Sequence, residues 1–189
     1  MTTTVEPPTA TAATPATALR NLYLVRFGFA VVWAVLLVVT ASSIGPVTTA
    51  LLVLYPLFDV AAAVVDLRAS KAARPAVGLR VNVALSLLTA AALGLAVTSG
   101  IPAVLRVWGA WAITAGIVQL VVAVRRYRLG GQWAMILSGG ISVLAGGGFV
   151  MMAGGPDAAL TSLAGYATLG GIFFLVSALR LHRVARAAR

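Results

Sequence analysis

Apolar residues occur in six long runs along the chain, and short polar or basic segments separate them. Each run holds roughly 20 residues, the length that an α-helix needs to cross the hydrocarbon core of a bilayer. The pattern predicts membrane-spanning helices over about residues 21–43, 46–67, 77–99, 102–124, 132–153 and 157–179. We therefore expect an all-α membrane protein with six transmembrane helices.

The runs also form a repeat, because a proline opens the second run of each pair and arginines follow that run (the prolines are Pro46, Pro102 and Pro156). Short breaks of this kind suit tight antiparallel hairpins. Since each repeat contains two spans, all three hairpins enter the membrane in the same direction. The sequence thus predicts hairpin repeats over about residues 20–68, 77–126 and 132–180 with pseudo-threefold symmetry. A looser bundle completed by oligomerisation is the alternative.

Two terminal segments flank the membrane domain that we predict over residues 20–183. Residues 1–19 are rich in Thr, Ala and Pro and lack the basic start and apolar core of a signal peptide. Such a composition cannot bury a core, so we predict a disordered tail. Residues 184–189 form a basic tail that we expect in the cytoplasm.

Charge decides the orientation and excludes one class of partner. The chain has a net charge of +10, but twelve of its fourteen basic residues fall on one predicted side of the membrane. This positive-inside pattern predicts that both termini are cytoplasmic. Basic residues do not converge on one groove as phosphate recognition requires, so we expect no nucleic-acid partner. The partner that the sequence does predict is the lipid bilayer.

Composition supports the membrane interpretation and suggests a source. Hydrophobic residues make up 61% of the chain and charged residues 10%, too apolar for a soluble domain of this length. Thirteen arginines stand against a single lysine, Lys71, a bias typical of GC-rich bacterial genomes. We therefore expect a multi-pass protein of the bacterial plasma (inner) membrane.

Residues able to perform chemistry are scarce. The chain has no cysteine, one histidine (His182) and four scattered acidic residues (Glu6, Asp59, Asp66 and Asp157). Metal binding needs several convergent ligands, and nucleophilic catalysis needs a base beside the nucleophile. Neither pattern is visible, so we predict no catalytic residues, no metal, no cofactor and no enzymatic activity.

Charged residues inside the predicted spans are the main candidates for function. Arg26 lies roughly 6–9 Å, and Asp59 about 12 Å, from the cytoplasmic ends of their helices at 1.5 Å per residue. Asp66 falls near the same helix face at the cytoplasmic edge. Charges at such depth are costly and indicate a partner or a function. Arg26 can pair with either carboxylate, as a structural ion pair or as part of a proton path.

Small residues mark the expected helix contacts, because helices in lipid associate by close packing. The fifth span carries a stripe of Ser138, Ser142 and Gly146. Gly116 and Gly171 occupy the positions in the later repeats that correspond to Asp59. Shallow polar residues, Asn82 and Gln119, are typical of hydrogen bonds between helices. Tyr55, Trp111 and Tyr166 recur near the middle of each second helix, where they line either a shared axis or ordinary helix contacts.

A family resemblance rests on short motifs in the first, fifth and sixth predicted spans. They are Leu24-Val25-Arg26-Phe27-Gly28, Trp133 with Gly139-Gly140-Ile141, and Gly170-Gly171-Ile172. Over about residues 20–183 the chain resembles the HdeD-type family of small bacterial membrane proteins. The resemblance implies six spans, an inner-membrane location and, from the family's namesake, a role in acid resistance. It implies no catalytic residues.

Two functions are consistent with these observations. The first is a non-enzymatic inner-membrane protein of acid or envelope stress physiology that acts through helix packing or assembly with itself or a partner. The second is a small proton-linked transporter or conduit that uses Asp59 and Arg26. A conduit needs a polar path across both leaflets, and the outer half of the predicted bundle holds few polar residues. That asymmetry favours the first function.

Overall fold

A computed structural model describes residues 15–69, 77–125, 127–129 and 132–187. Within this part the chain forms six α-helices: α1 (Pro15–Thr40), α2 (Pro46–Ala69), α3 (Val77–Ala96), α4 (Ile101–Arg125), α5 (Trp133–Met152) and α6 (Thr161–Ala187). Two short 3₁₀ turns, η1 (Val97–Ser99) and η2 (Tyr127–Leu129), follow α3 and α4. All six α-helices are long and apolar enough to cross a membrane. The prediction of a six-helix, multi-pass membrane protein is confirmed at this level.

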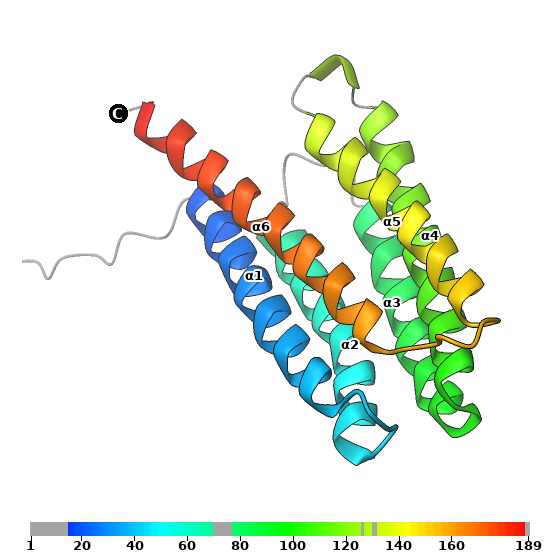
Figure 1. The fold of residues 1–189 in the computed structure, drawn as a ribbon. Coiled ribbons are helices and arrows are strands. Elements are labelled where there is room, and N and C mark those ends of the chain that lie inside the picture. Colours follow the sequence, from blue (N-terminus) through cyan, green and yellow to red (C-terminus); the bar gives the residue numbers. More distant parts are fainter. Residues whose placement is uncertain (1–14, 70–76, 126, 130–131, 188–189) are drawn as a thin grey trace, which may run out of the picture.

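The helix starts agree with the proline rule in two of the three repeats. Pro46 is the first residue of α2, and Pro102 is the second residue of α4, positions where the missing proline N–H costs nothing. The prediction was wrong for the third repeat, because α6 begins at Thr161 and Pro156 lies in the irregular segment 153–160 before it. This longer connection spans the distance between α5 and α6, which do not lie along each other (Figure 1).

The predicted tail and the first helix overlap. The structure extends α1 back to Pro15, so residues 15–19 are helical rather than part of a disordered tail. Proline suits the first position of a helix, and the alanines and leucine that follow are strong helix formers. Residues 1–14 lie outside the described residues. At the other end α6 continues to Ala187 and includes most of the predicted basic tail.

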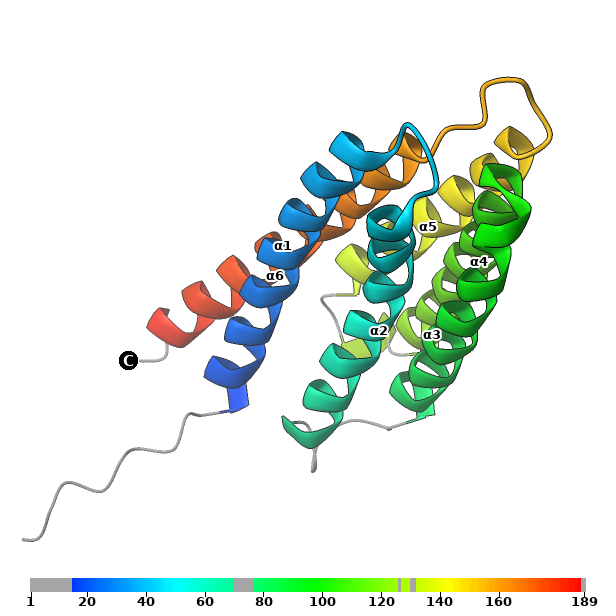
Figure 2. The ribbon, with the colours of Figure 1, turned by 90° about the horizontal axis from the view of Figure 1, so that it is seen from below.

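Close packing joins helices that the predicted hairpins keep apart. The helices α4 and α5 lie side by side along their length, as do α1 and α6, whereas α5 and α6 touch only sparsely. Figures 1 and 2 show α1 with α6 on one side of the molecule and α4 with α5 on the other. The expectation of a tight hairpin therefore fails for α5 and α6.

Glycines explain why α5 follows α4. A Cβ atom placed on Gly116 would lie 2.7 Å from the carbonyl oxygen of Gly139, and one placed on Gly146 would lie 2.6 Å from that of Gly109. Such approaches exclude any side chain, so the two backbones meet directly at both points. Ser142 lies between them, its Cβ 3.0 Å from the position that a Gly116 Cβ would take.

The contact stripe on α5 differs from the predicted one by a single residue. Gly139, which the predicted stripe omitted in favour of Ser138, makes the second close approach; Ser138 itself is half-buried. Gly139 and Gly146 are seven residues apart, close to two helical turns, whereas Ser138 and Gly146 are eight apart. Between α6 and α1, a Cβ on Gly171 would lie 3.1 Å from the Cβ of Ala30.

Aromatic side chains fill the interior of the bundle. Trp33 of α1 and Trp108 of α4 stack with ring centroids 5.4 Å apart, and Tyr55 of α2 lies 4.6 Å from Trp33 and 5.4 Å from Trp108. Trp111 contacts both Tyr55 and Trp108, at 6.1 and 5.4 Å. Two of the three repeated aromatic residues thus meet in one cluster between α1, α2 and α4. The third, Tyr166, packs on Phe149 of α5 at 5.7 Å.

Candidate functional site

A buried carboxylate stands in the middle of α2. Asp59, counted as a whole residue, is 8% exposed. It follows Pro56, the proline inside this helix, by three residues. Pro56 has no N–H, so the carbonyl of Leu52 one turn earlier loses its intrahelical hydrogen bond. The helix nevertheless continues through this position to Ala69, and it presents Asp59 to the neighbouring helices α1 and α3.

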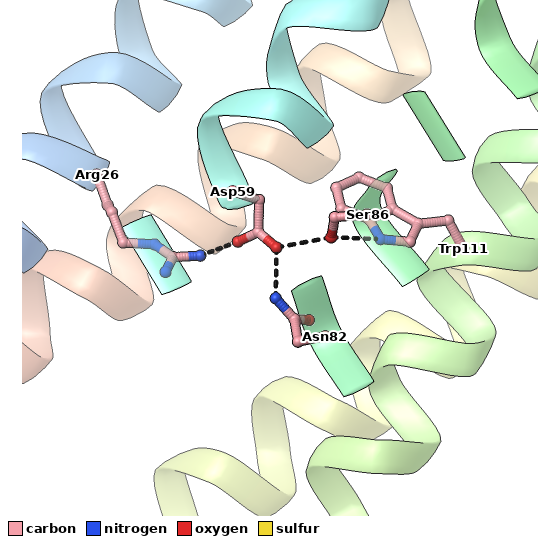
Figure 3. A network of polar contacts seen from close by, with 5 residues as sticks. All are labelled: Arg26, Asp59, Asn82, Ser86 and Trp111. Atoms are coloured by element: carbon pink, nitrogen blue, oxygen red, sulfur yellow. Dashed lines mark hydrogen bonds and ion pairs between the residues drawn. The ribbon is translucent and has the colours of Figure 1, made fainter. Parts of the chain in front are cut away.

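Both carboxylate oxygens of Asp59 accept hydrogen bonds (Figure 3). Oδ1 pairs with Nη2 of Arg26, which α1 supplies. Oδ2 accepts from Asn82 Nδ2 at 2.6 Å and from Ser86 Oγ at 2.9 Å. Asn82 and Ser86 are four residues apart on α3, so they share the face that packs against α2.

The network reaches a fourth helix through Ser86. The indole Nε1 of Trp111, on α4, donates to Ser86 Oγ at 3.3 Å. A continuous chain of polar contacts therefore crosses from Arg26 through Asp59 and Ser86 to Trp111, linking α1, α2, α3 and α4. Ser86 is fully buried, and hydrogen bonds of this kind stabilise helix association in lipid.

Arg26 makes a second contact on its other side. Its guanidinium carbon lies 4.2 Å from the ring centroid of Phe174, on α6. An arginine over an aromatic face gains a cation–π attraction, which strengthens when water is excluded. The side chains of Arg26 and Asp59 are 16% and 12% exposed. Arg26 thus joins α1 to α2 through an ion pair and to α6 through an aromatic ring.

A small cavity lies beside the ion pair. Its volume is about 20 Å³, enough for roughly one water molecule. Aromatic rings form most of its wall, and Arg26 and Asp59 close the rest (the aromatic residues are Phe29, Tyr55, Phe58 and Phe174).

The other predicted site residues lie outside this network. Asp66, seven residues after Asp59, is buried near the end of α2, and Arg26 pairs with Asp59 rather than with it. Gly116 and Gly171, at the positions equivalent to Asp59, approach neighbouring helices closely. Within the described residues no three His, Asp or Glu side chains lie close enough together to hold a metal ion.

Three network members were absent from the predicted site: Asn82, Ser86 and Trp111. Asn82 was expected only to form hydrogen bonds between helices. Asn82 and Ser86 are four residues apart, so they share one helix face, and this spacing could have placed both of them beside a buried acid. Gln119, the other residue expected to join helices, donates to the Met135 carbonyl of α5 at 3.2 Å.

No protein-family model, curated protein or solved structure matches this chain. The fold and the site therefore carry the functional argument. The chain is a polytopic membrane protein by its six apolar helices, and the network around Asp59 is its main polar feature inside the bundle.

Proposed function

We propose that this protein is a non-enzymatic, multi-pass protein of the bacterial inner membrane that acts through helix packing and assembly, in acid or envelope stress physiology. One observation carries the proposal. The buried carboxylate of Asp59 is hydrogen-bonded on both oxygens by three side chains from two other helices. The stress context rests on the resemblance to HdeD-type proteins alone.

The surroundings of Asp59 favour a structural role for it. A residue that carries protons across a membrane needs water on both sides of it in turn. One end of the bundle is the end at which α2 and α4 begin. Between Asp59 and that end, the rings of Trp33, Trp108 and Tyr55 contact one another. The cavity beside the ion pair holds only about one water molecule. A buried pair that joins helices fits this environment.

A proton-linked transporter or conduit is the second candidate. It is favoured by the position of Asp59, one turn after Pro56 and next to the water-sized cavity. Breaks near buried acids give transporters the irregular backbone that lines a binding site. In this protein α2 stays helical through Pro56, which counts against that arrangement.

Paired substitutions at Asp59 and Arg26 test the proposal. Asp59→Asn keeps the shape and leaves the Arg26 charge buried without its partner, so unfolding in detergent should become easier by about 3–5 kcal/mol. The double variant Arg26→Met/Asp59→Asn removes that charge, while the amide still accepts from Asn82 or Ser86. We expect it to recover most of the lost stability. A double variant no more stable than Asp59→Asn would contradict the structural pair.

Proton flux separates the two candidates. We expect the parent, reconstituted in vesicles with an internal pH-sensitive dye, to dissipate an imposed pH gradient no faster than empty vesicles. The refolded double variant should behave identically. If the parent conducts protons, and Asp59→Asn and the double variant both lose that proton flux, the proposal is overturned in favour of the transporter.

A further inference from the structure

A groove opens between α1 and α6 at their basic ends. Its volume is about 210 Å³, and five residues line it: Arg20 and Leu24 from α1, and Ala178, Leu179 and His182 from α6. Leu24 and Leu179 are about half-exposed, while Ala178 is buried. The groove therefore combines an apolar floor with two basic side chains at its rim.

Neighbouring side chains hold Arg20 in place. Its Nε and Nη2 donate to Asn21 Oδ1 at 3.3 and 3.1 Å, and its Nη1 lies 3.3 Å from His182 Nδ1. A guanidinium has five N–H donors, so N–H groups on both terminal nitrogens remain for a ligand. Because arginine can only donate, His182 Nδ1 must accept, which leaves Nε2–H of the neutral ring as a further donor.

Charge on the two helices that form the groove is of one sign. Neither α1 nor α6 contains an acidic residue. Beyond the groove, α6 carries Arg180, Arg183 and Arg186, all exposed. Such a surface attracts anions, and basic pockets between transmembrane helices near the membrane surface suit phospholipid headgroups.

We propose that this groove binds an anionic phospholipid, with its phosphate at Arg20 and His182 and the upper part of an acyl chain on Leu24 and Leu179. The two parts of the ligand match the two parts of the groove. Phosphate accepts hydrogen bonds from a fixed guanidinium, and the exposed leucines lose their contact with water or headgroups when an acyl chain covers them.

The test compares lipids on the purified protein in detergent. Phosphatidylglycerol should remain bound in native mass spectrometry and raise the unfolding temperature. Its affinity should exceed that of phosphatidylcholine by roughly tenfold or more, because both lipids carry a phosphate but the basic side chains around the groove repel the quaternary ammonium of phosphatidylcholine. Inorganic phosphate at the same concentration should have little effect, because it cannot use the apolar floor.

Variants locate the site. Arg20→Gln should abolish the preference for phosphatidylglycerol, and Arg20→Lys should retain part of it. Arg186→Gln is the matched control, since it removes an arginine of α6 that does not line the groove, and it should lower the preference far less than Arg20→Gln. If Arg20→Gln loses its helical circular dichroism, His182→Ala provides the same test, because it removes the second donor of the groove. The proposal is overturned if the groove variants bind like the parent, if Arg186→Gln weakens binding equally, or if phosphate alone gives the full thermal shift.

Discussion

Two tryptophans in the aromatic interior differ by a single hydrogen bond. Trp33 and Trp108 are 1% and 0% exposed, and their rings stack on each other. Trp33 Nε1 donates to the carbonyl of Leu51 at 2.7 Å, in the turn of α2 just before Pro56. Trp108 Nε1 is buried without a partner among the described residues. An unpaired buried donor costs free energy, so the two indoles contribute differently to stability.

Matched substitutions can measure this difference. Trp33→Phe and Trp108→Phe remove the same atoms from the same cluster, but only the first removes a hydrogen bond. We expect Trp33→Phe to lower the free energy of unfolding by about 1 kcal/mol more than Trp108→Phe. Chemical unfolding in detergent, followed by circular dichroism, measures both. Equal losses would mean that the Trp33 hydrogen bond adds nothing.

At the scale of helices, direct backbone contact between α4 and α5 organises one side of the bundle. Each of the two helices has two glycines that are seven residues apart. The glycines meet in two pairs, Gly109 with Gly146 and Gly116 with Gly139. The neighbouring Gly147 and Gly148 have open space where a Cβ would stand. Adjacent glycines of one helix thus have different roles.

Alanine substitutions should reveal these roles. Gly146→Ala places a Cβ 2.6 Å from a backbone oxygen, so the helices must separate, at a cost of about 1–3 kcal/mol. Gly147→Ala meets no neighbour and should stabilise the protein by up to about 1 kcal/mol, because alanine favours the helix. Thermal unfolding in detergent compares the two with the parent. If Gly146→Ala is as stable as Gly147→Ala, α4 and α5 do not pack as the structure shows.

At the scale of the whole molecule, all six helices connect into one body whose basic segments gather at one end. The start of α1, the end of α6 and the connection from α4 to α5 lie at that end (Figure 1). Arg20, Arg128 and Arg186 are on these segments. A bundle with this distribution of charge should insert with its basic end in the cytoplasm.

Accessibility of introduced cysteines checks that orientation, and the native chain offers no cysteine to interfere. Single cysteines at Ser43, Ser99 or Gly154, all exposed between helices, should react with an impermeant thiol reagent added to intact cells. Cysteines at Val77 or Tyr127, exposed at the other end, should react only after the membrane is opened. Labelling of Tyr127→Cys in intact cells would reverse the predicted topology.

The sequence by itself determined the number of helices and most of their limits. Both follow from local properties, since about 20 apolar residues must become helical to satisfy their backbone in lipid, and proline and glycine set the ends. Arg26 and Asp59 could also be singled out, because a charge inside an apolar run is costly wherever it lies. The choice between Asp59 and Asp66 as the partner of Arg26 stayed open.

Only the tertiary structure decided which helix faces meet. The rotation of α3 brings Asn82 and Ser86 to Asp59. Asn82 could be expected to join helices, but its partner could not be named, and Ser86 does not stand out in its run. In the same way, α5 lies along α4 and α6 along α1, while the predicted hairpin partners α5 and α6 touch only sparsely. Side-chain packing between distant segments sets these arrangements, and lipid covers any apolar face equally well, so hydrophobic pattern alone cannot select the partner.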